Sequence, residues 1–277
     1  MAADSRVIFT TVLDESGLRK GLNNLKGGVS GLAVGVGTAL GNIGATVLSS
    51  VVTGLVENAQ HYIDVASNLN EVQNVVDTTF GDSAEEVNNF ATAAKEAYGM
   101  SELKAKQFTS TMGAMLKSMG MTEAQTLGMS TSMAGLAGDM ASFYNLDYDT
   151  AFEKLRSGIS GETEPLKQLG INMSVANLEA YALAQGITTS YNRMTQAQQA
   201  TLRYNYLMSV TADAQGDFAR PRDGYSNQQR ILATTQEELA ATIGEILLPS
   251  ALKWTETLND MVGGIKVAVE WVGNLFN

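Results

Sequence analysis

The chain has 277 residues, of which 44% are hydrophobic and 7% aromatic, and its formal net charge is −11. This negative charge argues against nucleic acid as a specific partner, since nucleic-acid binding depends on cationic contacts to phosphate. The absence of cysteine excludes disulfides, thiol catalysis and Cys-ligated metals. The opening MAAD lacks the basic start and apolar core of a secretory signal. Abundant Ala, Leu and Met with only 3 prolines favour long helices. We therefore predict an all-α fold, an elongated multi-helix protein with helical hairpins.

The first quarter of the chain has two features. β-Branched residues partly alternate at 6–13, which predicts one short N-terminal strand. Residues 27–56 then contain no charge, and this stretch is long enough to cross a bilayer. Its glycines recur at intervals of four residues, which lets another helix backbone approach closely: Gly27, Gly31 and Gly35 form one row, Gly37 and Gly41 a second. Close packing in an assembly, membrane insertion and a flexible segment stay open.

Capping and breaking residues divide the rest of the chain into helices. The expected ranges are about 57–78, 84–97, 102–118, 122–143, 147–157, 174–185, 195–213, 226–247 and 249–276. The expected caps are Ser101, Thr122, Asp147, Ser174 and Thr195, together with a Ser83/Glu86 capping box. Gly120 is expected to close one helix, Pro221 and Gly224 to interrupt the chain, and Pro249 to join the last two helices.

Methionines are concentrated in the middle of the chain. Seven of the 13 lie between Met112 and Met140, most of them at spacings of three, four or seven residues. We interpret them as core filling. The alternative is an adaptable surface for a partner, since methionine repacks easily.

No motif in the sequence predicts catalysis, a metal or a cofactor. His61 is the only histidine, in a stretch without a catalytic motif, and is expected to be a surface or packing residue beside Tyr62. Glu162 and Glu164 are two carboxylates separated by one residue, but nothing places them across a substrate. The glycines near them lack the Gly-Lys-Ser/Thr of a phosphate loop. We predict a protein that is not an enzyme and binds no cofactor.

The stretch SGISGETEP (157–165) is instead expected to be a structural connection between helices. Glu164 is expected to cap the helix that begins at Pro165, because proline and acidic residues both favour the first helical turn. Ser160 or Thr163 is expected to hydrogen-bond exposed amides there. The structural loop therefore comprises Ser160, Gly161, Glu162, Thr163, Glu164 and Pro165.

Three long stretches of the sequence, and the order in which they follow one another, carry information about function. They are KSMGMTEAQTLGMSTSMAGLAGDMASFYNLDYDTAFEKLRSGISGETEPLKQLGINMS (117–174), RYNYLMSVTADAQGDFAR (203–220) and NQQRILATTQEELAATIGEILLPSALKW (227–254). We refer to them as the first, second and third block. In this order they resemble the conserved core region of phage tail tape measure proteins. The resemblance covers about 70–277 well, is weaker before that, and departs from the family pattern at Pro221.

The resemblance implies a structural protein made in the host bacterial cytoplasm and placed in the virion tail lumen. Such a protein scaffolds tail tube assembly, sets tail length and is released at DNA ejection. The implied partners are further copies of the chain, in a trimer or alternatively a hexamer, together with the tail tube protein, tail assembly chaperones and tail tip or baseplate proteins. The host membrane is a further partner on ejection. The alternative function is a membrane-active, pore-forming or envelope-penetrating protein that uses 27–56 and 249–276; a cell-wall hydrolase lacks supporting residues. Fully helical, the chain spans about 415 Å, which is short for a ruler, so we expect a fragment, a processed part or a minimal tape measure protein.

We expect four segments along the chain. They are 1–26 (strand and short helix), 27–80 (Gly-rich segment and helix), 81–240 (helical tape measure core) and 241–277 (C-terminal amphipathic helices). Self-association is expected through the glycine rows and through an apolar face of the last helix that carries Trp254, Val262, Ile265 and Val269.

Overall fold

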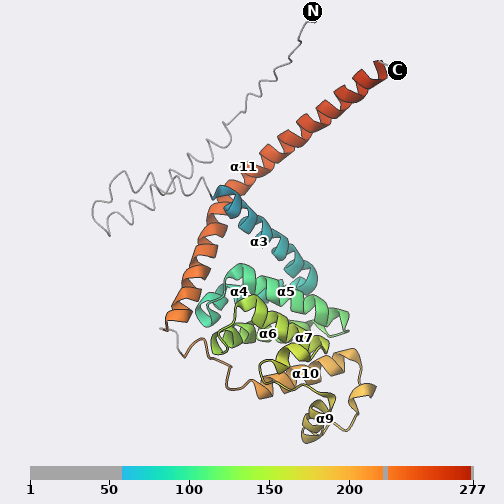
Figure 1. The fold of residues 1–277 in the computed structure, drawn as a ribbon. Helices are drawn as coiled ribbons and strands as arrows, with labels where there is room; N and C mark the ends of the chain where they lie inside the picture. The colour runs from blue at the N-terminus through green and yellow to red at the C-terminus, as the bar shows by residue number, and fades with distance from the viewer. Residues whose placement is uncertain (1–57, 221–223, 276–277) are drawn as a thin grey trace, which may run out of the picture. The chain divides into compact units, whose positions relative to one another are not determined.

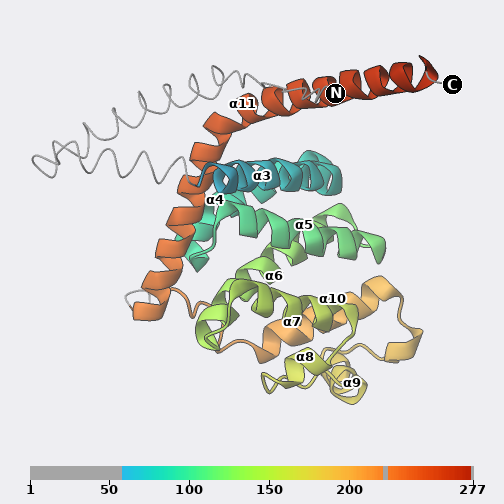
Figure 2. The ribbon, with the colours of Figure 1, turned by 45° about the horizontal axis from the view of Figure 1, so that its top comes forward.

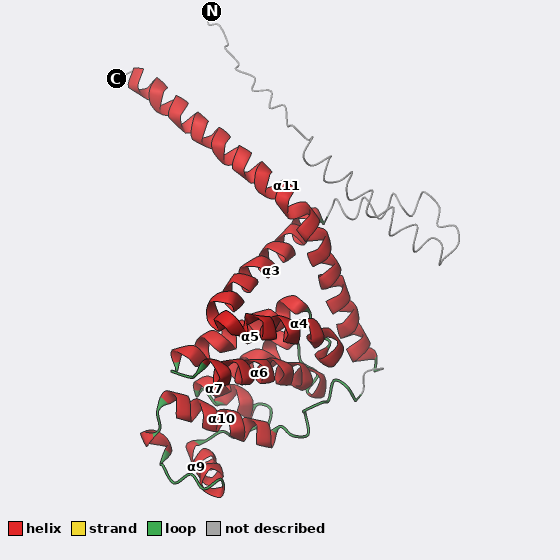
Figure 3. Cartoon of the chain, turned by 180° about the vertical axis from the view of Figure 1, so that it is seen from behind, coloured by secondary structure: helices red, strands yellow, loops and turns green. Residues whose placement is uncertain are grey.

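A computed structural model describes the backbone of residues 58–220 and 224–275, and the side chains in these ranges except Ser250 and those from Trp254 onward. Throughout this part of the chain every regular element is a helix and no strand occurs (Figure 3), which confirms the predicted all-α class. The predicted strand at 6–13 and the glycine rows at 27–41 lie outside the described residues. Among the helices that the structure describes, none combines the length and the apolarity needed to cross a bilayer.

The helices from α3 to α9 follow one another with short connections, and longer ones precede α10 and α11 (Figure 1). They are α3 (Ala59–Phe80), α4 (Ala84–Tyr98), α5 (Glu102–Ser118), α6 (Glu123–Phe143), α7 (Tyr148–Ser160), α8 (Glu164–Lys167), α9 (Val175–Ala184), α10 (Gln196–Val210) and α11 (Tyr225–Leu275). Two 3₁₀ turns, Gly81–Ser83 and Tyr191–Arg193, lie between them. The chain divides into a larger unit, 68–239, and a smaller unit formed by the residues up to Ser67 and those from Ala240 on.

The larger unit is a stack of helices around a main hydrophobic core, with a second, small cluster of Val76, Phe80 and Val87. Within it α4, α5, α6, α7 and α10 pack against their neighbours in the stack (Figure 2). Phe108 of α5 stacks on Phe152 of α7, with 4.2 Å between the ring centroids. Met112, Met133 and Met140 are completely buried in this core. The interpretation of the methionines as core filling is therefore confirmed for these residues.

Most of the predicted caps are confirmed. Ser101, Thr122, Asp147 and Thr195 each accept a hydrogen bond from a backbone amide three residues further on, and Thr122 and Thr195 form complete capping boxes. Each of these four residues is extended, as a capping residue must be to bring its side chain back to the first turn. Gly120, at a φ of +84°, follows the end of α5 as predicted.

The predicted caps at Ser83 and Ser174 are wrong. Ser83 belongs to the 3₁₀ turn and has a φ of −92° and a ψ of 10°, so its hydroxyl is directed away from α4 and donates to Glu123 Oε1. The Ser174 side chain makes no capping bond. Asn172 organises this entry instead, because its Oδ1 accepts from the Ser174 amide and its carbonyl oxygen accepts from Asn177 Nδ2.

The structure also corrects two helix boundaries. α10 ends at Val210, and the predicted interruption is confirmed because α11 begins at Tyr225. The two predicted C-terminal helices form the single helix α11, with Pro249 inside it. An interior proline removes one backbone hydrogen bond and usually bends the helix. Here the strong helix formers on both sides of Pro249 maintain helical geometry through it.

The smaller unit has a narrow contact between the start of α3 and α11. Ile243 and Leu247 pack against Ala59, Tyr62 and Ile63. Gly244 touches α3 so closely that a Cβ atom there would overlap the carbonyl oxygen of Tyr62. His61 is exposed, and its ring centroid lies 5.9 Å from that of Tyr62, as expected for a surface residue.

Candidate functional site

The loop after α7 joins α7 to α8, and its contacts differ from those expected. Gly161 ends α7 at a φ of +108°, and a Cβ atom there would lie 2.7 Å from Arg203 Nη2. Arg203, from α10, donates through Nη1 to the carbonyl oxygen of Ile159 at 2.8 Å. Gly161 is thus needed both for its backbone conformation and for the space that the guanidinium occupies.

The polar side chains of this loop do not cap α8. The Ser160 hydroxyl donates back to the carbonyl oxygen of Ser157, and Thr163 makes no capping bond because its backbone is helical rather than extended. Glu164 pairs with Lys167 at 2.8 Å within the single turn of α8. Pro165 lies in the first turn, as predicted.

The two carboxylates of the loop lie on the surface. Glu162 and Glu164 are both exposed, and Glu164 is engaged with Lys167. A shallow depression beside the loop is lined by Asp149, Thr150, Glu153, Lys154, Ser157 and Pro165. Its cation, Lys154, donates to Gln168 Oε1 at 2.6 Å and to the Pro165 carbonyl oxygen at 3.3 Å. Both hydrogen bonds connect α7 to α8, so the ammonium group of Lys154 has a structural role.

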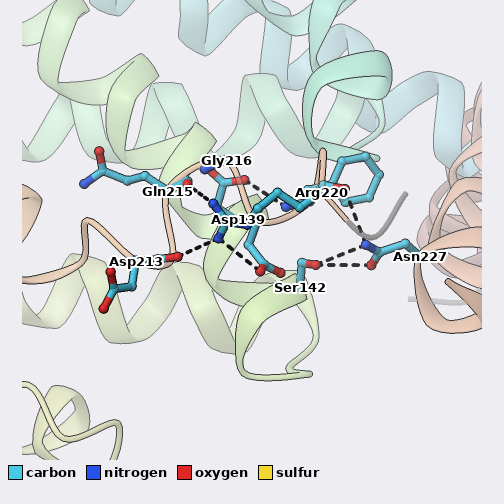
Figure 4. A network of polar contacts seen from close by, with 9 residues as sticks. Asp139, Ser142, Asp213, Gln215, Gly216, Arg220 and Asn227 are labelled. Atoms are coloured by element: carbon cyan, nitrogen blue, oxygen red, sulfur yellow. Dashed lines mark hydrogen bonds and ion pairs between the residues drawn. The ribbon is translucent and has the colours of Figure 1, made fainter. Parts of the chain in front are cut away.

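The most elaborate polar site in the larger unit lies around Asp139 of α6 (Figure 4). Asp139 is only 5% exposed, and its carboxylate accepts hydrogen bonds from two backbone amides, Gly216 N–H at 2.8 Å and Phe218 N–H at 3.3 Å. Asn227, at the start of α11, exchanges hydrogen bonds with Ser142 and donates to the carbonyl oxygen of Phe218. We call Asp139, Ser142, Gly216, Phe218 and Asn227 the Asp139 junction.

The Asp139 junction joins the three blocks defined from the sequence. Asp139 and Ser142 belong to the first block, Gly216 and Phe218 to the second, and Asn227 to the third. Residues almost 90 positions apart are therefore held by a few directional contacts. Between α10 and α11, turns within the segment satisfy the amides of Ala214, Gln215, Asp217 and Arg220, and Asp139 is the acceptor for those of Gly216 and Phe218.

Burial dominates the electrostatics of Asp139. Desolvation raises the pKa of its carboxyl above the ordinary value of 3.8, and the nearby Asp217 adds to this increase. The amides of Gly216 and Phe218 and the charge of Arg220 lower the pKa, but they offset only part of the effect of burial. Arg220 also donates to the carbonyl oxygens of Asp213 and Gln215, and so closes the segment on itself.

Side chains from distant parts of the sequence donate hydrogen bonds to carbonyl oxygens at the ends of several helices. Arg230 of α11 donates to the carbonyl oxygen of Ala141 in the last turn of α6 and to that of Leu146 in the connection that follows. Such groups lack an intrahelical partner and carry the negative end of the helix dipole, so a guanidinium there is stabilising. α11 thus contributes two polar residues, Asn227 and Arg230, to the C-terminal end of one helix.

The end of α4 is held in the same way. The Tyr148 hydroxyl donates to the carbonyl oxygens of Tyr98 and Gly99, each at 2.9 Å, and Thr234 of α11 donates to Gly99 as well. Burial raises the pKa of Tyr148 to about 12, although the charge of Arg230 lowers it. The hydroxyl therefore remains a donor at physiological pH. Gly99 has a φ of +65°, and a Cβ atom there would lie 2.5 Å from the Phe218 ring.

The sequence analysis did not select these residues. One signal was available: Asp139 is the single charge in MAGLAGDMAS, where small residues otherwise allow close packing. Gly135 and Gly138 in this stretch receive the side chain of Tyr98, and a Cβ atom at either would lie 2.7 Å from it. A lone carboxylate in such a stretch indicates a buried acceptor, but its amide donors lie 77 and 79 residues away and no local pattern identifies them.

The structure shows what the Asp139 junction does chemically. Its carboxylate, amide and hydroxyl groups bond to each other and to the backbone, so they position chain segments. Within the described ranges, no group of three or more His, Asp or Glu side chains is arranged to hold a metal ion. The predicted self-association residues cannot be placed: Gly27, Gly31, Gly35, Gly37 and Gly41 lie outside the described residues, as do the side chains of Trp254, Val262, Ile265 and Val269.

No family model matches the chain, and comparison with curated proteins and with solved structures also gives no match. The order of the three blocks is accordingly the basis for a functional hypothesis.

Proposed function

We propose that the chain is a tail tape measure protein, which scaffolds tube assembly and sets tail length in a phage or phage-tail-like particle and leaves at DNA ejection. The observation that carries the proposal is the resemblance of the three blocks (117–174, 203–220 and 227–254) to the core region of that family, in the family's order. The function is structural, and the chain needs no cofactor or catalytic residue for it.

The Asp139 junction supports the proposal by giving the three blocks a common physical role. Each block contributes at least one group to the junction, and Arg203 and Arg230 connect further points of the same blocks. Residues that resemble a family in three separated stretches are thus the ones that hold one folded unit together. This agreement is expected of a conserved structural core.

The proposed location is the lumen of the virion tail after synthesis in the host cytoplasm. The proposed partners are further copies of the chain, the tail tube protein, the assembly chaperones and the tail tip or baseplate proteins. The many polar groups of the larger unit that bond within the chain support a scaffold that folds before it meets these partners.

A gene disruption in the producing particle tests the function. Without the chain, we expect no tails or tails of uncontrolled length in electron micrographs, and complementation with the intact gene should restore a single length. As a matched control, complementation with Leu183→Ala, an exposed position on α9, should restore the same length. Tails of unchanged length would contradict the proposal. If those tails also failed to deliver DNA, the membrane-active alternative would take its place.

A further inference from the structure

The first part of α11, from Tyr225 to Leu239, is the last segment of the larger unit. Two of its residues are buried, and both are polar: Asn227 is 3% exposed and Thr234 is 4% exposed. A helix that packs on its own domain normally buries an apolar side. Among the described residues, however, no hydrophobic cluster contains a side chain from 225–239. This segment, which we call the strap, is therefore not part of an apolar core.

Polar contacts hold the strap, and they reach the C-terminal ends of α4 and α6 (Figure 4). The contacts are those of Asn227 with Ser142, of Arg230 with the carbonyl oxygens of Ala141 and Leu146, of Thr234 with the carbonyl oxygen of Gly99, and of Glu238 with Lys95. When the strap leaves, water replaces each partner, so a contact of this kind contributes little net stability. Apolar burial, which water cannot replace, is the contribution that the strap lacks.

The ends of α4 and α6 do not depend on the strap for all of their hydrogen bonds. The carbonyl oxygen of Gly99 also accepts from the Tyr148 hydroxyl at 2.9 Å. The carbonyl oxygen of Ala141 also accepts from the Leu146 amide at 2.9 Å. Both acceptors therefore keep a partner inside the larger unit when the strap leaves, and the hydrophobic core loses no side chain from the strap.

The rest of α11 is held differently. Beyond the strap, Ile243 and Leu247 are buried, and they pack against three apolar residues at the start of α3. A strap that has left the ends of α4 and α6 therefore remains next to a part of α11 that is attached through apolar contacts. Its attached and released states can exchange within one chain.

We propose that the strap is a conformational device, which detaches as one segment from the ends of α4 and α6 while the larger unit stays folded. Regions with few buried apolar contacts open at a lower free energy than the core of the same protein. Release exposes Asn227, Arg230 and Thr234 together with the carbonyl oxygens that they bind. This inference goes beyond the proposed function, since it concerns the isolated chain and its test does not use tail length.

Native-state hydrogen exchange of the full chain tests the proposal. A short helix without tertiary packing is only marginally stable in water, so the amides of a released strap exchange. Protection at 228–238 should be at least about tenfold lower than at the most protected amides of α5 and α6. Equal protection in the strap and in these helices would overturn the proposal, because the strap would then open only when the whole unit unfolds.

A pair of matched variants tests whether the polar contacts hold the strap. Arg230→Met keeps a long side chain but removes the hydrogen bonds to the end of α6. Exchange should become at least about tenfold faster throughout 228–238, with no change in α5 and α6. Gln229→Met introduces the same residue at the neighbouring, exposed position and should change exchange by less than about twofold.

The remaining outcomes of the Arg230→Met experiment count against the proposal. Unchanged exchange in the strap would show that the polar contacts do not hold it. Acceleration confined to the turn around Arg230 would indicate local fraying in place of release as one segment. Equal acceleration in α5 and α6, or loss of the folded larger unit, would show that the core depends on the strap.

Discussion

The larger unit, 68–239, and the contact between the start of α3 and α11 are built by different means. In the larger unit an apolar core is surrounded by side chains that cross long distances in sequence to reach helix ends, as Arg203 and Arg230 do. The contact between α3 and α11 rests on a few apolar residues and on the close approach at Gly244. Directional polar contacts therefore hold the helices of the larger unit in place. The contact between α3 and α11 depends instead on how closely the two helix backbones fit together.

The largest effect is expected in the core of the larger unit. Leu155 is completely buried, and Leu155→Ala should lower the free energy of unfolding by about 2–5 kcal/mol through lost burial and a residual cavity. Urea denaturation followed by circular dichroism measures this value. Leu183→Ala, at a strongly exposed position, should change it by less than about 0.5 kcal/mol. Equal effects at the two positions would contradict the assigned core.

The Asp139 junction should give the next largest effect. In Asp139→Asn one of the two side-chain acceptors becomes an amide donor that faces a backbone N–H group, which leaves a buried donor without a partner. We expect a loss of about 1–3 kcal/mol near neutral pH in the same denaturation experiment. A variant as stable as the parent would show that the Gly216 and Phe218 amides find other acceptors.

The pH dependence of this effect has a defined sign. The folded pKa of Asp139 is raised above 3.8, so the folded state binds the proton more tightly than the unfolded state. The proton-linked part of the contribution of Asp139 to stability is therefore fully present below 3.8 and is lost as the pH rises through the raised folded pKa. The hydrogen bonds that its carboxylate accepts from Gly216 and Phe218 account for the part that remains near neutral pH. The stability advantage of the parent over Asp139→Asn should grow as the pH falls toward 3.8. A difference that shrinks over this range would contradict the direction of the shift.

Asp147 should show the opposite dependence at lower pH. The hydroxyl and then the amide of Thr150 lower the pKa of the Asp147 carboxyl below 3.8. Its contribution to stability is present above 3.8 and is lost as the pH falls through the lowered folded pKa. The two carboxylates therefore affect the free energy of unfolding in different pH ranges. Asp147→Asn should remove the loss of stability below pH 3.8 that Asp147 causes, and it should leave the pH dependence caused by Asp139 unchanged.

Local patterns predict local structure well in this chain and long-range structure poorly. The helices and four of the caps follow from residues within one or two turns, since Thr122 and Gln125 complete a box by themselves. The two failed caps have different causes. Ser83 lies in a 3₁₀ turn and its hydroxyl donates to the distant Glu123, whereas the side chain of Asn172, two residues before Ser174, organises the start of α9. The contacts of Asp139 and Arg230 could not be predicted, because their partners are main-chain groups, which every residue carries and no sequence pattern distinguishes. The pair of Ser142 and Asn227 could not be predicted either, because 85 residues separate them.

A smaller effect on stability is expected from the helix caps. It distinguishes a residue that caps a helix from one that only has the sequence spacing of a cap. Thr122→Ala removes a complete capping box and should cost about 1 kcal/mol. Ser83→Ala removes a serine with the same sequence spacing to a glutamate but without a capping bond, and should cost less than about 0.5 kcal/mol. Thermal unfolding of the two variants measures the difference. Equal losses would mean that Ser83 caps α4 in solution.

The smallest effect on the larger unit is expected from Gly244→Ala. The added methyl group would overlap the carbonyl oxygen of Tyr62, so the start of α3 should separate from α11. We expect faster hydrogen exchange at the amides of 62–67 and unchanged exchange in α5 and α6. The unfolding free energy of the larger unit should stay within about 0.5 kcal/mol of the parent value, because its core and polar contacts are untouched.

Gly128 provides the matched control, because it lies inside α6 with no atom close to the position of a Cβ. Alanine is the better helix former, so Gly128→Ala should stabilise the larger unit by about 0.5–1 kcal/mol. The same gain in helix propensity operates at Gly244, and there it opposes the steric overlap with α3. If Gly244→Ala also stabilised its helix and left exchange at 62–67 unchanged, the two helices would not be in backbone contact, and the comparison between the two regions would fail.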